Sequence, residues 1–222
     1  MPQTGLESAF PSVDHPFPMP VASEIEPVSP GISIWRCYDR SVKADLFSTA
    51  LETASGTYLI DPIPLATEAV ASWEGQDKVA GIIVTNENHE RAAAQFSQKF
   101  AVPVYLSATL IGATRLPSAT PVQDKGFLRA LSAVEVEGAP AGEIAIHSAV
   151  GDGTMVVGDA LINFEPYGFA LLPAKYCSNF KVMRGSLSRL LDYSFGRMLF
   201  AHGLPILSRA RERLEQLLKD HR

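Results

Sequence analysis

Short apolar runs, separated by polar and turn residues, dominate the first half of the chain and return near its end. Runs rich in Val, Ile, Leu, Phe and Tyr that are bounded by Gly, Pro, Asp or Ser are typical of β-strands. The pattern predicts strands at residues 32–38, 44–53, 56–61, 79–84, 102–107, 133–137, 143–149, 154–157 and 197–201.

Other segments repeat their apolar residues every three or four positions, which predicts amphipathic helices. In one of them Ala93, Phe96 and Phe100 share a face. Residues 160–177 show neither period, and we expect them to be irregular. Helices are predicted at residues 65–73, 90–100, 107–113, 181–191 and 206–219.

Proline concentrates at the start of the chain, where residues 1–30 hold seven of the sixteen prolines. Proline lacks an N–H donor, so this segment cannot pair as a central strand. We expect an N-terminal arm over residues 1–31 and a single domain over residues 32–222. Two β-rich stretches that each lead into strand–helix units predict an α+β fold, a four-layer αββα sandwich.

Charge and composition narrow the classes of partner. The net charge is −5 and no run of Lys or Arg occurs, which argues against a nucleic-acid partner. No apolar stretch is long enough to span a bilayer, which argues against a membrane. The two cysteines lie far apart, at Cys37 and Cys177, as in a reduced cytoplasmic chain. The oligomeric state stays open.

Chemistry-bearing residues gather where predicted strands end. The strand at residues 79–84 opens into Thr85-Asn86-Glu87-Asn88-His89-Glu90-Arg91 ("TNENHER"), and other strands open into "DPIPL", "GAPAGE", "GDALIN" and "AHGLP". In sheets of this kind, loops at the carboxyl ends of strands collect functional groups. We therefore expect these five loops to surround one cleft.

Five short motifs in this order resemble the metallo-β-lactamase-like hydrolase superfamily, whose pattern is Asp, Thr-His-x-His-x-Asp-His, Gly-His-Thr-x-Gly, Gly-Asp-Ala and His-Gly. The stretches "YLIDP", "VVGDAL" and "LFAHGLPIL" carry the match, which runs from about residue 32 to the end of the chain. The resemblance implies the αββα fold. It also implies that Asp159 is the bridging carboxylate, that His202 is a metal ligand and that Asp61 supports the metal loop.

The chain departs from the family pattern at most ligand positions. Asn86 and Asn88 stand where the family has two histidines, Ala139 stands at the third, and Glu90 and Arg91 replace an aspartate and a histidine. Amide oxygens are poor substitutes for imidazole on zinc. His89 falls on a non-ligand position, and we expect it to point away from the cleft.

Two accounts of this cleft remain open. Glu90, Asp159 and His202 could hold one zinc or another divalent ion, although the guanidinium of Arg91 would repel it. Alternatively no cofactor is present, and Arg91 replaces the metal by hydrogen bonding to the carboxylates of Glu90 or Asp159. In simpler structural interpretations, Asn88 caps the following helix, Glu90 lies in its first turn, and His202 is a hydrogen-bonded core residue.

Three functions follow, and whether the chain is an enzyme stays open. The first is a metal-free or weakly metal-binding protein for a small molecule, which could be anionic because Lys175, Lys181 and Arg184 lie near the expected cleft. The second is a hydrolase of ester, thioester or phosphoester bonds with a single metal. The third is a metal-free enzyme with Asp159 or His202 as general base, for which the sequence offers no nucleophile.

Overall fold

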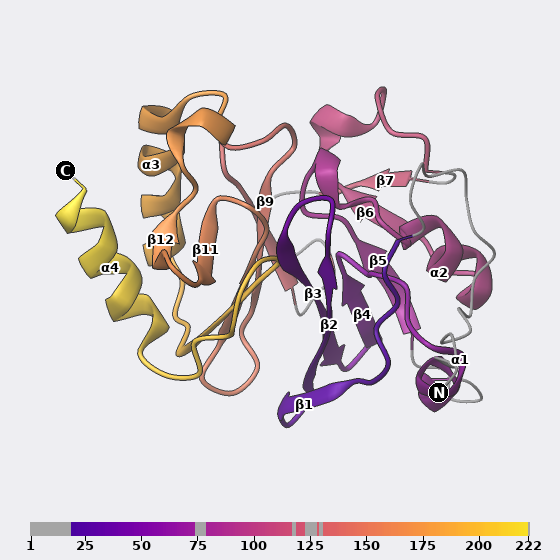
Figure 1. Ribbon diagram of the computed structural model, residues 1–222. Coiled ribbons are helices and arrows are strands. Elements are labelled where there is room, and N and C mark those ends of the chain that lie inside the picture. Colours follow the sequence, from indigo (N-terminus) through magenta and orange to yellow (C-terminus); the bar gives the residue numbers. More distant parts are fainter. Residues whose placement is uncertain (1–18, 74–78, 117–118, 123–127, 129–130, 222) are drawn as a thin grey trace.

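The computed structural model describes residues 19–73, 79–116, 119–122, 128 and 131–221. Two large β-sheets lie at its centre, and helices cover the outer side of each (Figure 1). The layers follow the order helix, sheet, sheet, helix, which confirms the α+β fold and its four-layer αββα sandwich.

The larger sheet has seven strands, which lie side by side in the order of the sequence. β1 to β4 are antiparallel and β4 to β7 are parallel. A turn at Ala54 and Ser55 joins β3 to β4. The strands are β1 (Glu26–Ser29), β2 (Ile32–Asp39), β3 (Ala44–Thr53), β4 (Gly56–Ile60), β5 (Val79–Ile83), β6 (Val104–Leu106) and β7 (Ala119–Pro121).

The smaller sheet has four strands in the order β13-β10-β9-β8, and only its β10–β13 pair is parallel. A separate hairpin, β11 and β12, lies in the segment that was expected to be irregular, so that expectation is wrong. Its strands are too short to show a period of two, and Glu165 and Pro166 interrupt the pattern. The strands are β8 (Leu131–Glu135), β9 (Ile144–Ser148), β10 (Thr154–Val157), β11 (Leu161–Phe164), β12 (Gly168–Leu171) and β13 (Arg197–Phe200).

Helices α1 and α2 cover the seven-stranded sheet, and α3 and α4 cover the other (Figure 1). Two of the longer helices start later than predicted, because Arg91 (φ 38°) precedes α2 and Arg209 (φ 55°) precedes α4 in conformations that do not continue a helix. The helices are α1 (Thr67–Val70), α2 (Ala93–Phe100), α3 (Phe180–Leu187) and α4 (Ala210–Asp220), with 3₁₀ turns η1 (Ala71–Trp73), η2 (Glu87–His89), η3 (Ala108–Leu110), η4 (Ala174–Tyr176) and η5 (Ser188–Asp192).

Three apolar cores fill the spaces between the four layers. Trp35 and Phe96 lie in the core between α1, α2 and the larger sheet, where the Trp35 Nε1 donates to Ile63 O at 3.0 Å. Met183 and Leu214 anchor α3 and α4 to the smaller sheet. The central core joins the two sheets, and its buried members include Ile34, Phe47, Tyr58, Ile83, Ile144, Ile146, Val156 and Leu199.

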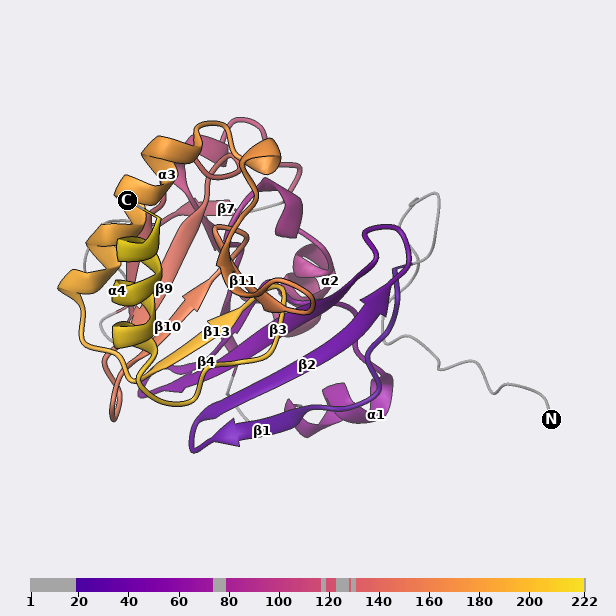
Figure 2. The same ribbon diagram turned by 60° about the vertical axis from the view of Figure 1, so that its left-hand side comes forward.

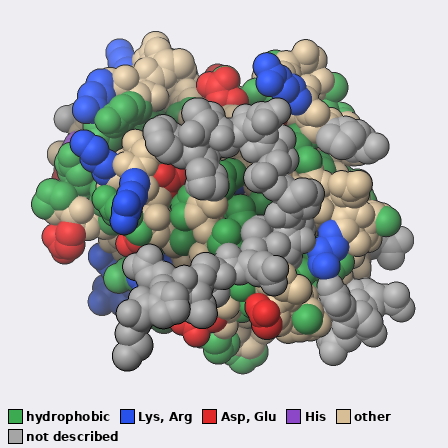
Figure 3. Space-filling view, turned by 45° about the vertical axis from the view of Figure 1, so that its right-hand side comes forward, with side chains coloured by type: hydrophobic (Ala, Val, Ile, Leu, Met, Phe, Trp, Pro, Cys, Tyr) green, Lys and Arg blue, Asp and Glu red, His purple; other side chains and the backbone are tan. Residues whose placement is uncertain are grey.

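The end of the N-terminal arm reaches the larger sheet. β1 occupies the outer edge of the sheet (Figure 2), where Pro27 costs no central pairing. Ala22 forms a bridge with Leu65. Residues 1–18 of the arm lie outside the described residues, and the division at residue 32 stays a prediction. No helix of the described chain is long and apolar enough to cross a membrane. Basic and acidic side chains are interspersed on the face that Figure 3 shows.

Candidate functional site

The carboxyl ends of four strands meet at one edge of the two sheets. β4 ends before Asp61, β5 ends before the 85–91 loop, β10 ends before Asp159 and β13 ends before His202. These strand ends lie at the floor of a cavity of about 1160 Å³, which His89, Asp159 and His202 line. Residues from four of the five expected loops line this cavity, none from "DPIPL" does, and the side chains that converge are not all the expected ones.

His89 points into this site, so the expectation that it points away is wrong. The side chain of Asn86 accepts from the Asn88 N–H and caps the 3₁₀ turn η2, which directs His89 inward. The imidazole is only 2% exposed, and its Nδ1 lies 2.9 Å from Asp61 Oδ2. Thr85 also holds this carboxylate, through its backbone N–H (2.8 Å) and its hydroxyl (2.6 Å).

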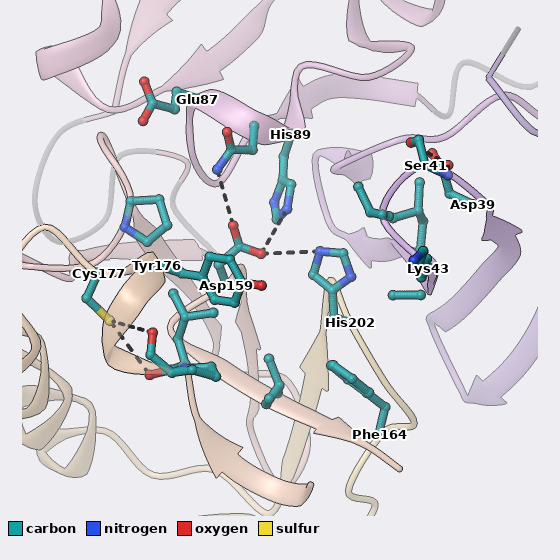
Figure 4. A pocket seen from close by; sticks show the side chains of 18 of the residues that line it. Asp39, Ser41, Lys43, Glu87, His89, Asp159, Phe164, Tyr176, Cys177 and His202 are labelled. Carbon is teal, nitrogen blue, oxygen red and sulfur yellow. Dashed lines mark hydrogen bonds and ion pairs between the residues drawn. The ribbon is translucent and has the colours of Figure 1, made fainter. Parts of the chain in front are cut away.

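Asp159 is the centre of the cluster. Its Oδ1 lies 3.2 Å from the Nε2 of His89 and 3.2 Å from the Nε2 of His202. Its Oδ2 accepts from the Nδ2 of Asn86 at 3.1 Å and faces the Nδ2 of Asn88 at 3.5 Å. Figure 4 shows the carboxylate between the two imidazoles. The donor atoms of His89, Asp159 and His202 all lie within 4.8 Å of one another.

Glu143 is a buried carboxyl group that sequence reasoning missed. It accepts from Asn86 Nδ2 at 2.6 Å and from the Ala160 backbone N–H at 3.1 Å. Burial, together with the Asp159 charge, raises its pKa to about 8. A carboxylate directly before the apolar run "IAI" was the available signal. Gly158 leaves room for it, because a Cβ there would lie 2.9 Å from both Glu143 carboxyl oxygens.

Arg91 does not pair with Glu90 or Asp159, so the predicted hydrogen bond to those carboxylates is wrong. Its Nη1 donates to the backbone carbonyl oxygens of Phe47 (2.7 Å) and Asp61 (3.0 Å). The positive φ of Arg91 turns the side chain toward β3 rather than along the helix. Burial lowers the pKa of the guanidinium. Arg91 therefore ties the β4 end to β3 and lines the cavity with a fixed positive charge.

Glu90 and Ala139 lie apart from the converging donors. The Glu90 carboxylate accepts from the Thr114 hydroxyl at 2.5 Å, and His89 takes its place in the group that could hold a metal. The Ala139 side chain lies in the core under α3 and carries no donor. Asn88 does not cap the following helix, because α2 begins only at Ala93 and has Ala92 at its N-cap. The predicted set of Glu90, Asp159 and His202 is thus replaced by His89, Asp159 and His202.

The charges of the cluster balance one another. Burial raises the pKa of both Asp61 and Asp159, but His89 outweighs it together with Arg91 and Thr85 at Asp61 and with His202 at Asp159, so both pKa values lie below the usual range. Burial lowers the pKa of the His89 imidazole, but Asp159 and Asp61 outweigh it and raise that pKa to about 9. Burial lowers the pKa of His202, even beside Asp159. At neutral pH, cationic His89 and Arg91 therefore offset the two aspartates.

The walls of the cavity are mostly apolar, and two lysines and the carboxylates of Asp39 and Glu87 lie among them. One wall is the β2–β3 loop with Val42 and Lys43, and the opposite wall combines the β11–β12 hairpin with the segment around η4. Lys175 lies over the Tyr176 ring, 4.6 Å from its centroid. Lys181 and Arg184, which were expected near the cleft, are not among the described residues that line it. The apolar lining of these two walls includes Val42, Ile162, Phe164, Tyr167, Leu172 and Tyr176.

Comparisons with known proteins match this architecture. A sequence model of the metallo-beta-lactamase superfamily matches residues 27–220, while no curated protein matches the chain. The DIM-1 metallo-beta-lactamase aligns with a TM-score of 0.67 at 13% identity, over 92% of this chain and 100% of that one. A metallo-beta-lactamase from Pontibacter korlensis aligns with a TM-score of 0.68 at 17% identity, over 89% and 99%.

FIM-1 from Pseudomonas aeruginosa, solved in its mono-zinc form, aligns with a TM-score of 0.62 at 12% identity, over 89% of this chain and 95% of that one. At such identities the structural matches show the fold alone. The family model, in contrast, spans nearly all of the described chain, from β1 to the last turn of α4. The chain belongs to the metallo-beta-lactamase superfamily.

Proposed function

We propose that this chain binds a small molecule with an apolar body and an anionic group in the cavity above Asp159. One observation carries the proposal: the cavity has a volume of about 1160 Å³, apolar walls and two rim lysines, although most metal-ligand positions of the family are lost. Ligand sites of this size are typically apolar with a few placed polar groups. The apolar walls would bury the body, and Lys43 and Lys175 would attract the anion.

The two-metal centre implied by the family does not fit these residues. The amide of Asn86 is fully buried, with its Nδ2 donating to Glu143 and Asp159 and its Oδ1 accepting from Asn88 N–H. Ala139 offers no metal-donor atom, and the guanidinium of Arg91 donates hydrogen bonds to two backbone carbonyl oxygens. The first of the two ions would thus lack its ligands. For this reason the proposed function is binding of a small molecule and not catalysis by a pair of metal ions.

Octanoate is a suitable probe, because it pairs an apolar chain with a carboxylate. With a chelator present, octanoate added to the isotope-labelled chain should shift the amide resonances of Lys43 and Tyr167. Octanol and octylammonium should bind more weakly, since neither carries the negative charge. Lys43→Gln and Lys175→Gln should each weaken octanoate binding by about two- to fivefold, the range of an exposed ion pair.

Lys181→Gln is the matched control. It removes the same positive charge, but from a residue that is not among the described residues lining the cavity. Its octanoate affinity should equal that of the parent. Equal affinity for octanoate and octylammonium would contradict the anionic part of the proposal. Resonance shifts confined to α4 would contradict the cavity itself.

A second function is favoured by the convergence of His89, Asp159 and His202. One divalent ion held there would supply Lewis-acid polarisation of an ester, thioester or phosphoester oxygen. The chain would orient it through Asp61, which fixes the His89 ring, and through Asn86, which holds the second oxygen of Asp159. This function requires that the ion binds.

A further inference from the structure

We propose that His89 has taken over the metal-ligand role of the neighbouring position 90, so that His89, Asp159 and His202 form a site for one zinc ion. The family pattern assigns no ligand to the position of His89. The site does not depend on the small-molecule binding proposed above, because it is built from different contacts.

The separations of the donor atoms suit a shared ion. Two donors that each lie about 2.0–2.1 Å from a tetrahedral zinc are about 3.3 Å from one another. The Nε2 atoms of His89 and His202 each lie 3.2 Å from the same oxygen, Asp159 Oδ1. The three donor atoms stay within 4.8 Å of one another, so small rotations of the imidazoles bring them around one ion.

The orientation of His89 is that of a ligand with a supporting carboxylate. Its Nδ1 lies against Asp61, which leaves Nε2 directed at the cluster. This Nε2 is buried and has no hydrogen-bond partner among the described residues, although it lies 3.2 Å from Asp159 Oδ1. Metal-bound histidines commonly have their other ring nitrogen on a carboxylate, which fixes the ring. Nε2 thus makes only an ion-pair contact with Asp159, which a metal ion shared by the two atoms would replace.

The two asparagines at former ligand positions also support this arrangement. Asn86 and Asn88 direct their Nδ2 groups at Asp159 Oδ2, so Oδ1 is the oxygen left facing both imidazoles. They hold the carboxylate in a one-oxygen binding mode instead of binding an ion themselves. Glu90 is tied to Thr114 and does not join the group.

Zinc is the ion that fits these three side chains. Two imidazoles, one carboxylate and an open fourth position are typical of catalytic zinc sites. His202 and Asp159 both line the cavity, so the fourth position can face it. The charge of Arg91 beside the cluster opposes a dication and weakens its binding.

The test is a zinc titration of the metal-free chain against a chromophoric chelator, at about pH 8.5 because metal ligands bind in their deprotonated forms. The parent should bind one equivalent, and zinc should raise its Tm. His89→Gln and His202→Gln should each lower the affinity by at least about 100-fold. Glu90→Gln is the matched control, since it changes the family's ligand position and should leave the affinity unchanged.

A second measurement uses the parent alone, so it remains informative if a histidine variant fails to fold. Cobalt(II) added to the parent should shift the ring resonances of His89 and His202 strongly and those of His147 little. Three results would each overturn the proposal. The parent binds no zinc, or Glu90→Gln loses zinc binding while His89→Gln keeps it, or cobalt shifts the ring resonances of His202 but not those of His89. Octanoate binding is measured with chelator present, so either proposal can fail without the other.

Discussion

At the scale of single residues, the site differs from the family pattern in the side chains at several positions. The family's imidazoles at two positions are asparagines, and an imidazole appears at the position between Asn88 and Glu90. Asn86 now joins Glu143 to Asp159 through a single Nδ2 group. The Asn86 amide does not titrate. The protonation state of Glu143 therefore decides whether the group of Glu143, Asn86 and Asp159 carries one or two negative charges.

Replacing Glu143 by Gln tests that state. The pKa of Glu143 is raised from 4.5 to about 8 in the folded chain, so the folded state binds more protons than the unfolded state between these values. The parent's free energy of unfolding should therefore fall as pH rises through this window. Glu143→Gln does not titrate, but it keeps only one of the two acceptor oxygens, because Asn86 and the Ala160 N–H donate to different ones. That loss does not depend on pH, so the stability of Glu143→Gln relative to the parent should rise toward pH 8.

Urea unfolding at pH values below, within and above the window measures this difference. Exposed Glu87→Gln is the matched control, since it makes the same change at the surface. If the difference between Glu143→Gln and the parent does not change with pH, Glu143 is ionised in the folded protein and the assignment is wrong.

At the scale of elements, the ends of β10 and β13 and the start of β11 form one connected unit. Asn163 N–H donates to His202 O at 3.1 Å, and Leu204 N–H donates to Asn163 O at 3.0 Å. Gly203 lies between them with φ 116°, and a Cβ there would lie 2.1 Å from Asn163 O. The β11–β12 hairpin therefore fixes the backbone that presents His202 to the site.

Gly203→Ala should disturb this unit. Both the close approach and the positive φ oppose a side chain, so we expect a loss of about 1–3 kcal/mol in the free energy of unfolding and a displaced His202. Gly168→Ala is the control, because Gly168 also has a positive φ (62°) but no atom within 4 Å of an added Cβ. Equal losses in the two variants would mean that the contact with Asn163 contributes nothing.

At the scale of the whole molecule, the site lies between the two sheets and needs both. Asp61 and His89 come from the seven-stranded sheet and its loops, while Asp159 and His202 come from the four-stranded sheet. The central core joins the sheets through fully buried side chains. The two halves of the site should therefore form and unfold together.

Truncation of this core measures the coupling. Ile146→Ala should lower the free energy of unfolding by about 2–5 kcal/mol, whereas the exposed Ile111→Ala should change it by less than about 0.5 kcal/mol. Trp35 and Trp73 report by fluorescence on the core beneath α1 and α2, and far-ultraviolet circular dichroism reports on the whole chain. Both signals should give one midpoint in every variant, and two separate midpoints would show that the sheets unfold independently.

Much of the fold and part of the site are local properties of the sequence. Short apolar runs with turn residues between them locate most strands, and the order of the motifs at their ends indicates the αββα sandwich. Asp159 and His202 line the cavity, and Asp61 lies buried beneath it against His89, because each lies at or just after the carboxyl end of a strand. A residue fixed to the carboxyl end of a strand has little freedom to lie elsewhere.

Tertiary structure alone decided which donors converge. His89 turns inward because the Asn86 cap and the η2 turn set its direction, and Arg91 turns toward β3 because its φ is positive. Glu143 meets Asn86 although 57 residues separate them, because β9 and β5 belong to sheets that face one another. The sequence by itself determined the strand ends and the residue types placed there. The direction and the partners of each side chain depend on backbone dihedrals and on contacts between distant segments, which no local pattern encodes.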